Sequence, residues 1–222
     1  MEIIDQTGKL KISLFHATST LFLNSILENG LAGRNVILEW KILDMAKRVY
    51  ELSEQYLSES NTFIRSSDSF KKMVEQSNNG GFNFQHGQTY VSASKSTVIR
   101  YALSNLYGSE ILSYTIKFLT ELINLGIDEL INLRNDFEDI FNIMNIDHEP
   151  LIIQIDDVYS QFLISEHGDD ATNNLNYLAN FPEALFDALA QQFNFRLLAN
   201  SKNYKLTFWK LDTENQLYEF CV

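Results

Sequence analysis

Phe15-His16-Ala17-Thr18 is the stretch on which the interpretation of this chain depends. Residues 9–17 are expected to form the first strand, and residues 20–29 are expected to form a helix with Ser19 or Thr20 at its cap and Gly30 at its end. The histidine therefore stands where a strand passes directly into a helix, and it is the first candidate for a functional site.

Two further segments place polar and aromatic residues at the ends of expected strands. Gly87-Gln88-Thr89-Tyr90-Val91-Ser92 ends a short strand, and Tyr101 follows eleven positions after Tyr90. Glu149 immediately precedes Pro150 and an apolar strand expected at residues 151–155. Each segment alone is a weak signal, but the three in this order are considerably more specific.

In order and spacing, the three segments resemble the ADP-ribosyltransferases of the diphtheria-toxin and poly(ADP-ribose) polymerase type. That family has a His-x-Thr/Ser strand end, a Tyr-x10-Tyr pair and a downstream Glu that opens a strand. The resemblance implies an α+β fold, namely an ADP-ribosyltransferase-like split β-sandwich with flanking helices. It also implies NAD as a co-substrate, with no metal.

The resemblance assigns a role to each motif residue. His16 would hold the adenosine-side ribose, Tyr90 and Tyr101 would stack on nicotinamide, and Glu149 would contact the ribose hydroxyl and orient the acceptor. The expected catalytic residues are Glu149, His16 and Tyr90. The expected cofactor-binding residues are His16, Ala17, Thr18, Tyr90, Ser92, Tyr101 and Arg34.

Two residues depart from the family pattern. Family members carry Gly directly after the motif His, where the backbone pairs with the nicotinamide carboxamide, whereas this chain has Ala17. They also place a carboxamide-binding Ser eight residues after the first Tyr, and Val98 stands there instead. Thr18 and Ser92 are the remaining hydroxyl groups that suit this role, so nicotinamide recognition is expected to be looser here.

The proposed chemistry suits these residue types independently of the resemblance. Nicotinamide in NAD is a flat cationic ring, so two Tyr faces offer stacking and cation–π attraction of roughly 0.5–2 kcal/mol per contact. Breaking the glycosidic bond leaves positive charge on the ribose, which a nearby carboxylate stabilises. Tyr90, Tyr101 and Glu149 are the candidates for these two tasks.

Composition and charge narrow the remaining choices. The 222 residues are 45% hydrophobic, so one domain spanning residues 1–222 is expected. The net charge is −12 with scattered Lys and Arg, and no broad footprint for nucleic acid is present. A single cysteine, Cys221, excludes an intrachain disulfide and fits a reducing compartment. The His spacing does not suit zinc, and neither a Rossmann nor a Walker glycine motif is found.

A helical insertion is expected at about residues 36–77, with helices at 36–57 and 68–76. Further along, the pattern predicts a helix at 94–106, a strand at 110–118, a helix at 119–144 and a strand at 161–165. A helix at 174–192, interrupted by Pro182, is followed by strands at 195–198 and 204–211.

We expect a mono-ADP-ribosyltransferase that releases nicotinamide and passes ADP-ribose to a macromolecule, as a bacterial toxin or effector. Protein is favoured over nucleic acid as the acceptor, and an antitoxin or immunity protein would be a further partner. With neither a secretory signal nor a membrane segment in the sequence, we expect a cytoplasmic location, or delivery into a target cell by a dedicated secretion system.

Three alternatives remain open from the sequence. NAD hydrolysis would use the same site with water as the acceptor. An RNA 2′-phosphotransferase on a related fold would need cations that converge on phosphates, for which Arg34, Arg65 and Arg100 are the suppliers near the motifs. A non-catalytic binding module on the same fold would fit the departures at Ala17 and Val98.

Overall fold

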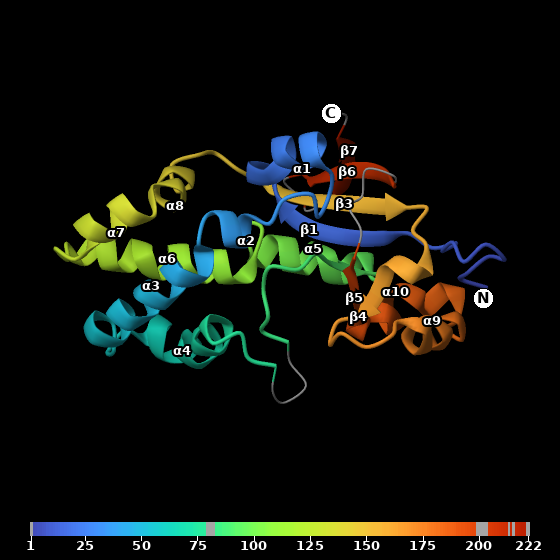
Figure 1. The fold of residues 1–222 in the computed structure, drawn as a ribbon, viewed down its shortest axis with the longest axis horizontal. Helices are drawn as coiled ribbons and strands as arrows, with labels where there is room; N and C mark the ends of the chain where they lie inside the picture. The colour runs from blue at the N-terminus through green and yellow to red at the C-terminus, as the bar shows by residue number, and fades with distance from the viewer. Residues whose placement is uncertain (1, 79–82, 199–203, 213, 215, 221–222) are drawn as a thin grey trace. The chain divides into compact units, whose positions relative to one another are not determined.

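The chain folds into two compact units, each assembled from separate segments. A computed structural model of the chain describes residues 2–78, 83–198, 204–212, 214 and 216–220 (Figure 1). Residues 1–34, 88–108 and 148–222 belong to a sheet unit, and residues 35–87 and 109–147 belong to a helical unit. Cys221 lies outside the described residues.

Within the described residues, the sheet unit contains one antiparallel sheet in the order β4-β5-β2-β1-β3-β6-β7. The expected mixture of helices and strands is therefore confirmed. The strands are β1 (Leu14–Ser19), β2 (Tyr90–Ser92), β3 (Pro150–Asp156), β4 (Leu163–Ser165), β5 (Asn194–Leu197), β6 (Lys205–Leu211) and β7 (Leu217–Phe220).

The strand pairing in the sheet is shortest between β1 and β2. β1 pairs with β3 along its whole length, from Leu14 opposite Ile155 to Ser19 opposite Pro150. With β2 it shares the single pair Phe15 opposite Ser92. Strands β4, β5 and β2 therefore form one group, strands β1, β3, β6 and β7 form another, and a short join links them.

Alternate side chains of the strands face two different apolar cores. Leu14, Val91 and Ile153 contribute to the larger core, which also contacts α1 (Leu23–Asn29) and α9 (Thr172–Ala179). Phe15 and Ala17 belong to a smaller core covered by α5 (Lys95–Ser104). Figure 1 shows α1 and α5 on opposite sides of β1 and β3. We call these two sides the α1 face and the α5 face.

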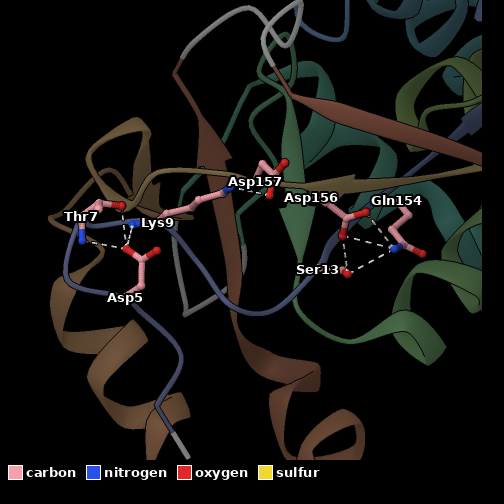
Figure 2. A network of polar contacts seen from close by, with 7 residues as sticks. All are labelled: Asp5, Thr7, Lys9, Ser13, Gln154, Asp156 and Asp157. Carbon is pink, nitrogen blue, oxygen red and sulfur yellow. Dashed lines mark hydrogen bonds and ion pairs between the residues drawn. The ribbon is translucent and has the colours of Figure 1, made fainter.

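The first strand begins at Leu14, so the expected start at residue 9 is wrong. The preceding residues are held in turns by polar contacts, shown in Figure 2. The Asp5 carboxylate accepts hydrogen bonds from the Thr7 hydroxyl at 2.7 Å and from the Lys9 backbone N–H at 3.0 Å. These contacts lower the pKa of Asp5, the Thr7 hydrogen bond most of all. The Lys9 ammonium then pairs with Asp157 at 2.7 Å.

A second polar group in Figure 2 links the start of β1 to the end of β3. The Ser13 hydroxyl donates to the Asp156 carboxylate at 2.6 Å, and the Gln154 amide donates to the Ser13 hydroxyl at 3.2 Å. Because these groups bond to one another, the polar side chains at this end of the two strands have hydrogen-bond partners. The same contacts reinforce the register of β1 on β3.

The helices of the sheet unit begin and end at residues that favour helix boundaries. The expected helix at 20–29 divides into η1 (Thr20–Phe22), capped by the Ser19 hydroxyl, and α1, which ends at Gly30 with φ of 81°. The expected helix at 174–192 is interrupted around Pro182. After α9 the chain continues as η3 (Glu183–Leu185), α10 (Phe186–Leu189) and η4 (Ala190–Gln192), and η2 (Ser160–Phe162) precedes β4.

The helical unit is assembled around aromatic side chains from three helices. The Phe118 ring lies 5.3 Å from the Phe63 ring, edge to face, and stacks on the Phe70 ring at 5.3 Å. Tyr50 contacts both Phe63 and Phe70. The helices are α2 (Val36–Glu39), α3 (Ile42–Tyr56), α4 (Asn61–Val74), α6 (Glu110–Leu125), α7 (Leu130–Asp136) and α8 (Glu138–Ile143).

Three sequence expectations fail in this unit. The helix expected at 119–144 is interrupted after Leu125, where Gly126 has a φ of 69°, and the chain continues as α7 and α8. The strand expected at 110–118 is wrong, because these residues form the first part of α6, which the Ser109 hydroxyl caps. Its buried residues recur at helical spacing: Ile111, Leu112, Thr115, Ile116, Phe118, Leu119 and Leu122. The helix expected at 36–57 is also broken, because Lys41 has a φ of 50° between α2 and α3. The insertion expected at 36–77 is the first of two segments that build the helical unit.

No helix in the described parts of the chain combines the length and the apolar character needed to cross a membrane.

We expect Phe118→Ala to lower the free energy of unfolding by about 3–5 kcal/mol, because the ring is completely buried between two others. Urea unfolding followed by circular dichroism would measure the loss. Ile131→Ala is the matched control, since this side chain is 68% exposed and should change stability by less than about 0.5 kcal/mol. Equal losses for the two variants would contradict the aromatic core.

Candidate functional site

His16 lies at the join between β1 and β2 and bridges the two strands. Its ring nitrogen Nδ1 is 2.7 Å from the backbone carbonyl oxygen of Tyr90. A carbonyl oxygen only accepts, so Nδ1 carries the hydrogen and donates it. Burial lowers the pKa of His16 more than this hydrogen bond raises it, so the ring is neutral near pH 7. Nε2 then presents a lone pair, which suits a hydroxyl donor such as a ribose O–H.

The hydrogen bond from His16 replaces the next rung of the ladder between β1 and β2. In an antiparallel pair, backbone groups of alternate residues point toward the same neighbouring strand. The Thr20 N–H bonds to the Glu149 carbonyl on the β3 side, so the N–H and C=O of Ala17 are directed toward β2. The β1–β2 register ends at Phe15 and Ser92, and the Tyr90 carbonyl is taken by His16. The Ala17 backbone therefore faces the gap where the strands part.

The two departures from the family pattern lie in the same place in the fold. Ala17 and Val98 are 7% and 5% exposed, and both belong to the small apolar core beneath α5. Ala102 of α5 and Ile152 of β3 complete the contact. The Ala17 methyl group and the Val98 side chain thus hold α5 against β1, at the two positions where family members use Gly and Ser.

Tyr90 lies next to polar residues of β5, and of the segment after β4, that the sequence interpretation missed. Arg196 lies directly opposite Tyr90, and its guanidinium carbon is 5.7 Å from the centroid of the Tyr90 ring. The Arg196 Nε donates to the backbone carbonyl of Glu166 at 2.8 Å. The Asn194 amide donates to the Glu166 carboxylate at 3.0 Å. Tyr90, Arg196, Asn194 and Glu166 therefore form one polar cluster on the α5 face.

The sequence contains a signal for the strand that carries this cluster, but the signal does not show which strand it pairs with. Asn194-Phe195-Arg196 alternates polar and apolar residues, which indicates a strand with one polar face. Nothing in a single sequence says that this strand pairs with Tyr90, more than 100 positions earlier.

Thr18 and Ser92, the two expected polar contacts, are not brought together. Thr18 is buried and alternates with Ala17 along β1, so its side chain lies on the α1 face with that of His16. Ser92 lies on the α5 face, where its hydroxyl accepts from the Ser94 N–H at 3.2 Å and donates to the Phe193 carbonyl at 3.4 Å. Ser92 thus fixes the turn that leads into α5.

Tyr101 and Arg34 occupy exposed positions in the sheet unit. Tyr101 lies on the outer side of α5 and is 38% exposed. Arg34 is exposed in the loop that follows α1. Tyr90 and Tyr101 are therefore both on the side of the sheet that α5 covers, whereas Arg34 follows a helix that packs on the opposite face.

Glu149 lies apart from Tyr90. It is opposite Thr20, four residues beyond His16 along the paired strands, which is roughly 13 Å at about 3.3 Å per residue. Its side chain is 62% exposed, and its carboxylate pairs with the Lys210 ammonium at 2.8 Å. Lys210 lies opposite Leu151 of the larger core, so this ion pair is on the α1 face. In the role that the motif assigns to it, Glu149 stays a prediction.

No protein-family model, curated protein or solved structure matches this chain. Among the described residues, no three His, Cys, Asp or Glu side chains gather as metal ligands would. The functional argument therefore rests on the motifs and on the geometry of the β1–β2 join.

We expect the free energy of unfolding to fall as the pH drops below about 6.5, because the folded chain lowers the pKa of His16 and the unfolded chain takes up the proton first. The stabilisation is fully present above that pH and is lost on acidification. His16→Asn keeps an N–H donor for the Tyr90 carbonyl without a titrating ring. Urea unfolding at about pH 7.5 and about pH 5 should show a smaller pH dependence for the variant, and equal slopes would contradict this assignment.

Proposed function

We propose that this chain is an NAD-dependent mono-ADP-ribosyltransferase with a split β-sandwich of the ADP-ribosyltransferase type. The observation that carries the proposal is the hydrogen bond between His16 and Tyr90, which brings together two motifs 74 residues apart. The proposal is further supported by the narrow join between β1 and β2, which divides the sheet into two groups of strands at the motif residues.

The proposed NAD site uses the gap between β1 and β2. The backbone N–H and C=O of Ala17 would pair with the nicotinamide carboxamide, as the family pattern implies. Tyr90 and Tyr101 would stack on the nicotinamide ring. The neutral His16 would accept a hydrogen bond from the adenosine-side ribose through Nε2.

Two carboxylates compete for the role of stabilising the ribosyl cation. Glu149 is assigned by its place in the motif, but its carboxylate pairs with Lys210 on the α1 face. Glu166 lies on the same face as Tyr90 and is oriented by the Asn194 amide. A carboxylate must lie close to the developing charge to stabilise it, because Coulomb energy falls with distance. Glu149 shares the α1 face with His16, whereas Glu166 follows β4, which β5 separates from β2. We therefore keep Glu149 as the first candidate for this role and Glu166 as the alternative.

The acceptor in this proposal is a macromolecule, with protein favoured over nucleic acid because the net charge is −12. The role would be that of a toxin or effector, with an antitoxin or immunity protein as a further partner. Hydrolysis of NAD differs only in that water replaces the acceptor, so the same site supports both reactions.

A second candidate is a binding module on the same fold that does not cleave NAD. The specific observation in its favour is the apolar contact of Ala17 with Val98, which fills the place where family members hold the carboxamide. Such a module would bind NAD or ADP-ribose without releasing nicotinamide, so one assay separates the two candidates.

The decisive measurement is the release of nicotinamide from NAD by purified protein, with and without cell lysate. We expect Glu149→Gln to lower the rate by about 10²–10³-fold, because the substitution keeps size and hydrogen bonding but removes the charge that stabilises the transition state. Glu166→Gln is the matched control, a carboxylate held by the Asn194 amide, and should lower the rate less than about threefold.

The outcomes of this assay are distinct. A large loss in Glu166→Gln with little effect of Glu149→Gln would transfer the role to Glu166 and leave the enzymatic proposal intact. NAD binding by the wild type without nicotinamide release would favour the binding module. Matched thermal melting curves for the three proteins would exclude unfolding as the cause of any loss.

A further inference from the structure

A hollow of about 420 Å³ lies between α5 and the segment that leads into β5. Its volume falls within the range of small-molecule sites in proteins. The hollow has an apolar side and a polar side with one cationic group. The lining residues are Thr97, Arg100, Ala188, Leu189, Gln191 and Gln192.

Arg100 supplies a positive charge that neighbouring carboxylates do not neutralise. Its Nη2 donates to the Gln191 amide oxygen at 3.0 Å and to the Thr97 hydroxyl at 3.3 Å. Among the described residues, both partners of this guanidinium are neutral. Asp187, the acid beside the lining residue Ala188, is hydrogen-bonded to the Ser96 backbone N–H at 3.2 Å, at the start of α5.

These contacts orient the Arg100 guanidinium without pairing it with a negative charge. The guanidinium has five N–H groups in a planar fork that matches the geometry of phosphate oxygens. The Thr97 hydroxyl and the side-chain amides of Gln191 and Gln192 supply further donors at the rim. Arg100 is exposed at the opening of the hollow. In a chain of net charge −12, such an oriented cation favours one anionic ligand over a general basic surface.

The hollow shares one side of α5 with Tyr101. Thr97, Arg100 and Tyr101 stand at positions i, i+3 and i+4 of the helix, and side chains at this spacing are neighbours. Tyr101 is about one helical turn, or roughly 5.4 Å, beyond Thr97. In NAD, the ring that would stack on Tyr101 is one ribose away from the diphosphate. A dinucleotide on Tyr101 can therefore extend its phosphates toward Arg100.

We propose that this hollow is the diphosphate subsite of the bound dinucleotide, with Arg100 as its principal ligand-binding residue. This inference rests on the proposed function for the identity of the ligand, and it adds a residue and a place that the motif pattern does not supply. Arg100 binds the diphosphate, and Gln191 and Thr97 hold its guanidinium in position.

The test is isothermal titration calorimetry of ADP-ribose, inorganic pyrophosphate and nicotinamide against the full chain. We expect Arg100→Gln to weaken ADP-ribose binding by about 10- to 100-fold, since a hydrogen bond to a charged group is lost, and to leave nicotinamide binding unchanged. Arg100→Lys keeps the charge but not the fork and should lose less. Arg65→Gln, an exposed arginine of the helical unit, is the matched control and should bind ADP-ribose as the wild type does.

Failure of this inference is distinguishable from failure of the proposed function. Equal ADP-ribose affinity in the wild type and Arg100→Gln overturns the subsite, whether or not the protein cleaves NAD. Failure of the wild type to bind ADP-ribose overturns it as well, and binding of pyrophosphate alone excludes a dinucleotide as the ligand. If ADP-ribose binding depends on Arg100 while no nicotinamide is released, the subsite stands and the transferase reaction does not.

Discussion

The hydrogen bond from the His16 ring to the Tyr90 carbonyl is the interaction on which the site depends. A longer ladder between β1 and β2 would consume the Ala17 N–H, the Ala17 C=O and the Tyr90 C=O in backbone pairs. Because the ladder has one pair and the imidazole takes the Tyr90 carbonyl at 2.7 Å, the strands stay joined while the Ala17 backbone faces the gap. The same bond fixes the tautomer, so one neutral side chain both holds the sheet together and presents an acceptor.

Packing of α5 explains why this gap carries Ala17 and Val98. An α-helix over a sheet needs apolar contacts at their interface, and here the Ala17 methyl group and Val98 supply part of them. The Lys95 ammonium adds a contact 4.6 Å from the centre of the Trp209 ring. Gly at position 17 and Ser at position 98 would give a ligand more room and more polar contacts, but they would weaken the packing of α5 on the sheet. In the proposed site, Ala17 and Val98 would thus stabilise the helix that carries Tyr101 and reduce the polar contacts available to the carboxamide.

Local signals in the sequence predicted much of the sheet unit and little of the arrangement between its strands. β3 contains the apolar run Leu151-Ile152-Ile153, and Gly30 ends α1 where the preference for glycine at helix C-termini places it. The strand expected at 110–118 is wrong because Leu112, Tyr114, Ile116 and Phe118 stand at alternate positions, whereas the buried residues of α6 follow the helical period to Leu122. The faces of Glu149 and Glu166 depend on the register of β3 on β1 and of β5 on β2. Register is set by pairing between distant segments, so a single sequence cannot reveal which carboxylate shares a face with Tyr90.

The proposed NAD ligand would account for the way the cations of the sheet unit are distributed. Lys210 pairs with Glu149, and Lys9 pairs with Asp157, so both stabilise the fold. Arg100 instead bonds to neutral oxygens. NAD combines a cationic ring with an anionic diphosphate, so a site for it needs an aromatic face and a positive charge within one ribose of each other. A helix meets this requirement with two neighbouring positions, because residues 100 and 101 lie on adjoining parts of one surface. An acidic chain can bind an anionic cofactor with few Lys and Arg side chains, provided that these side chains are not already held in ion pairs.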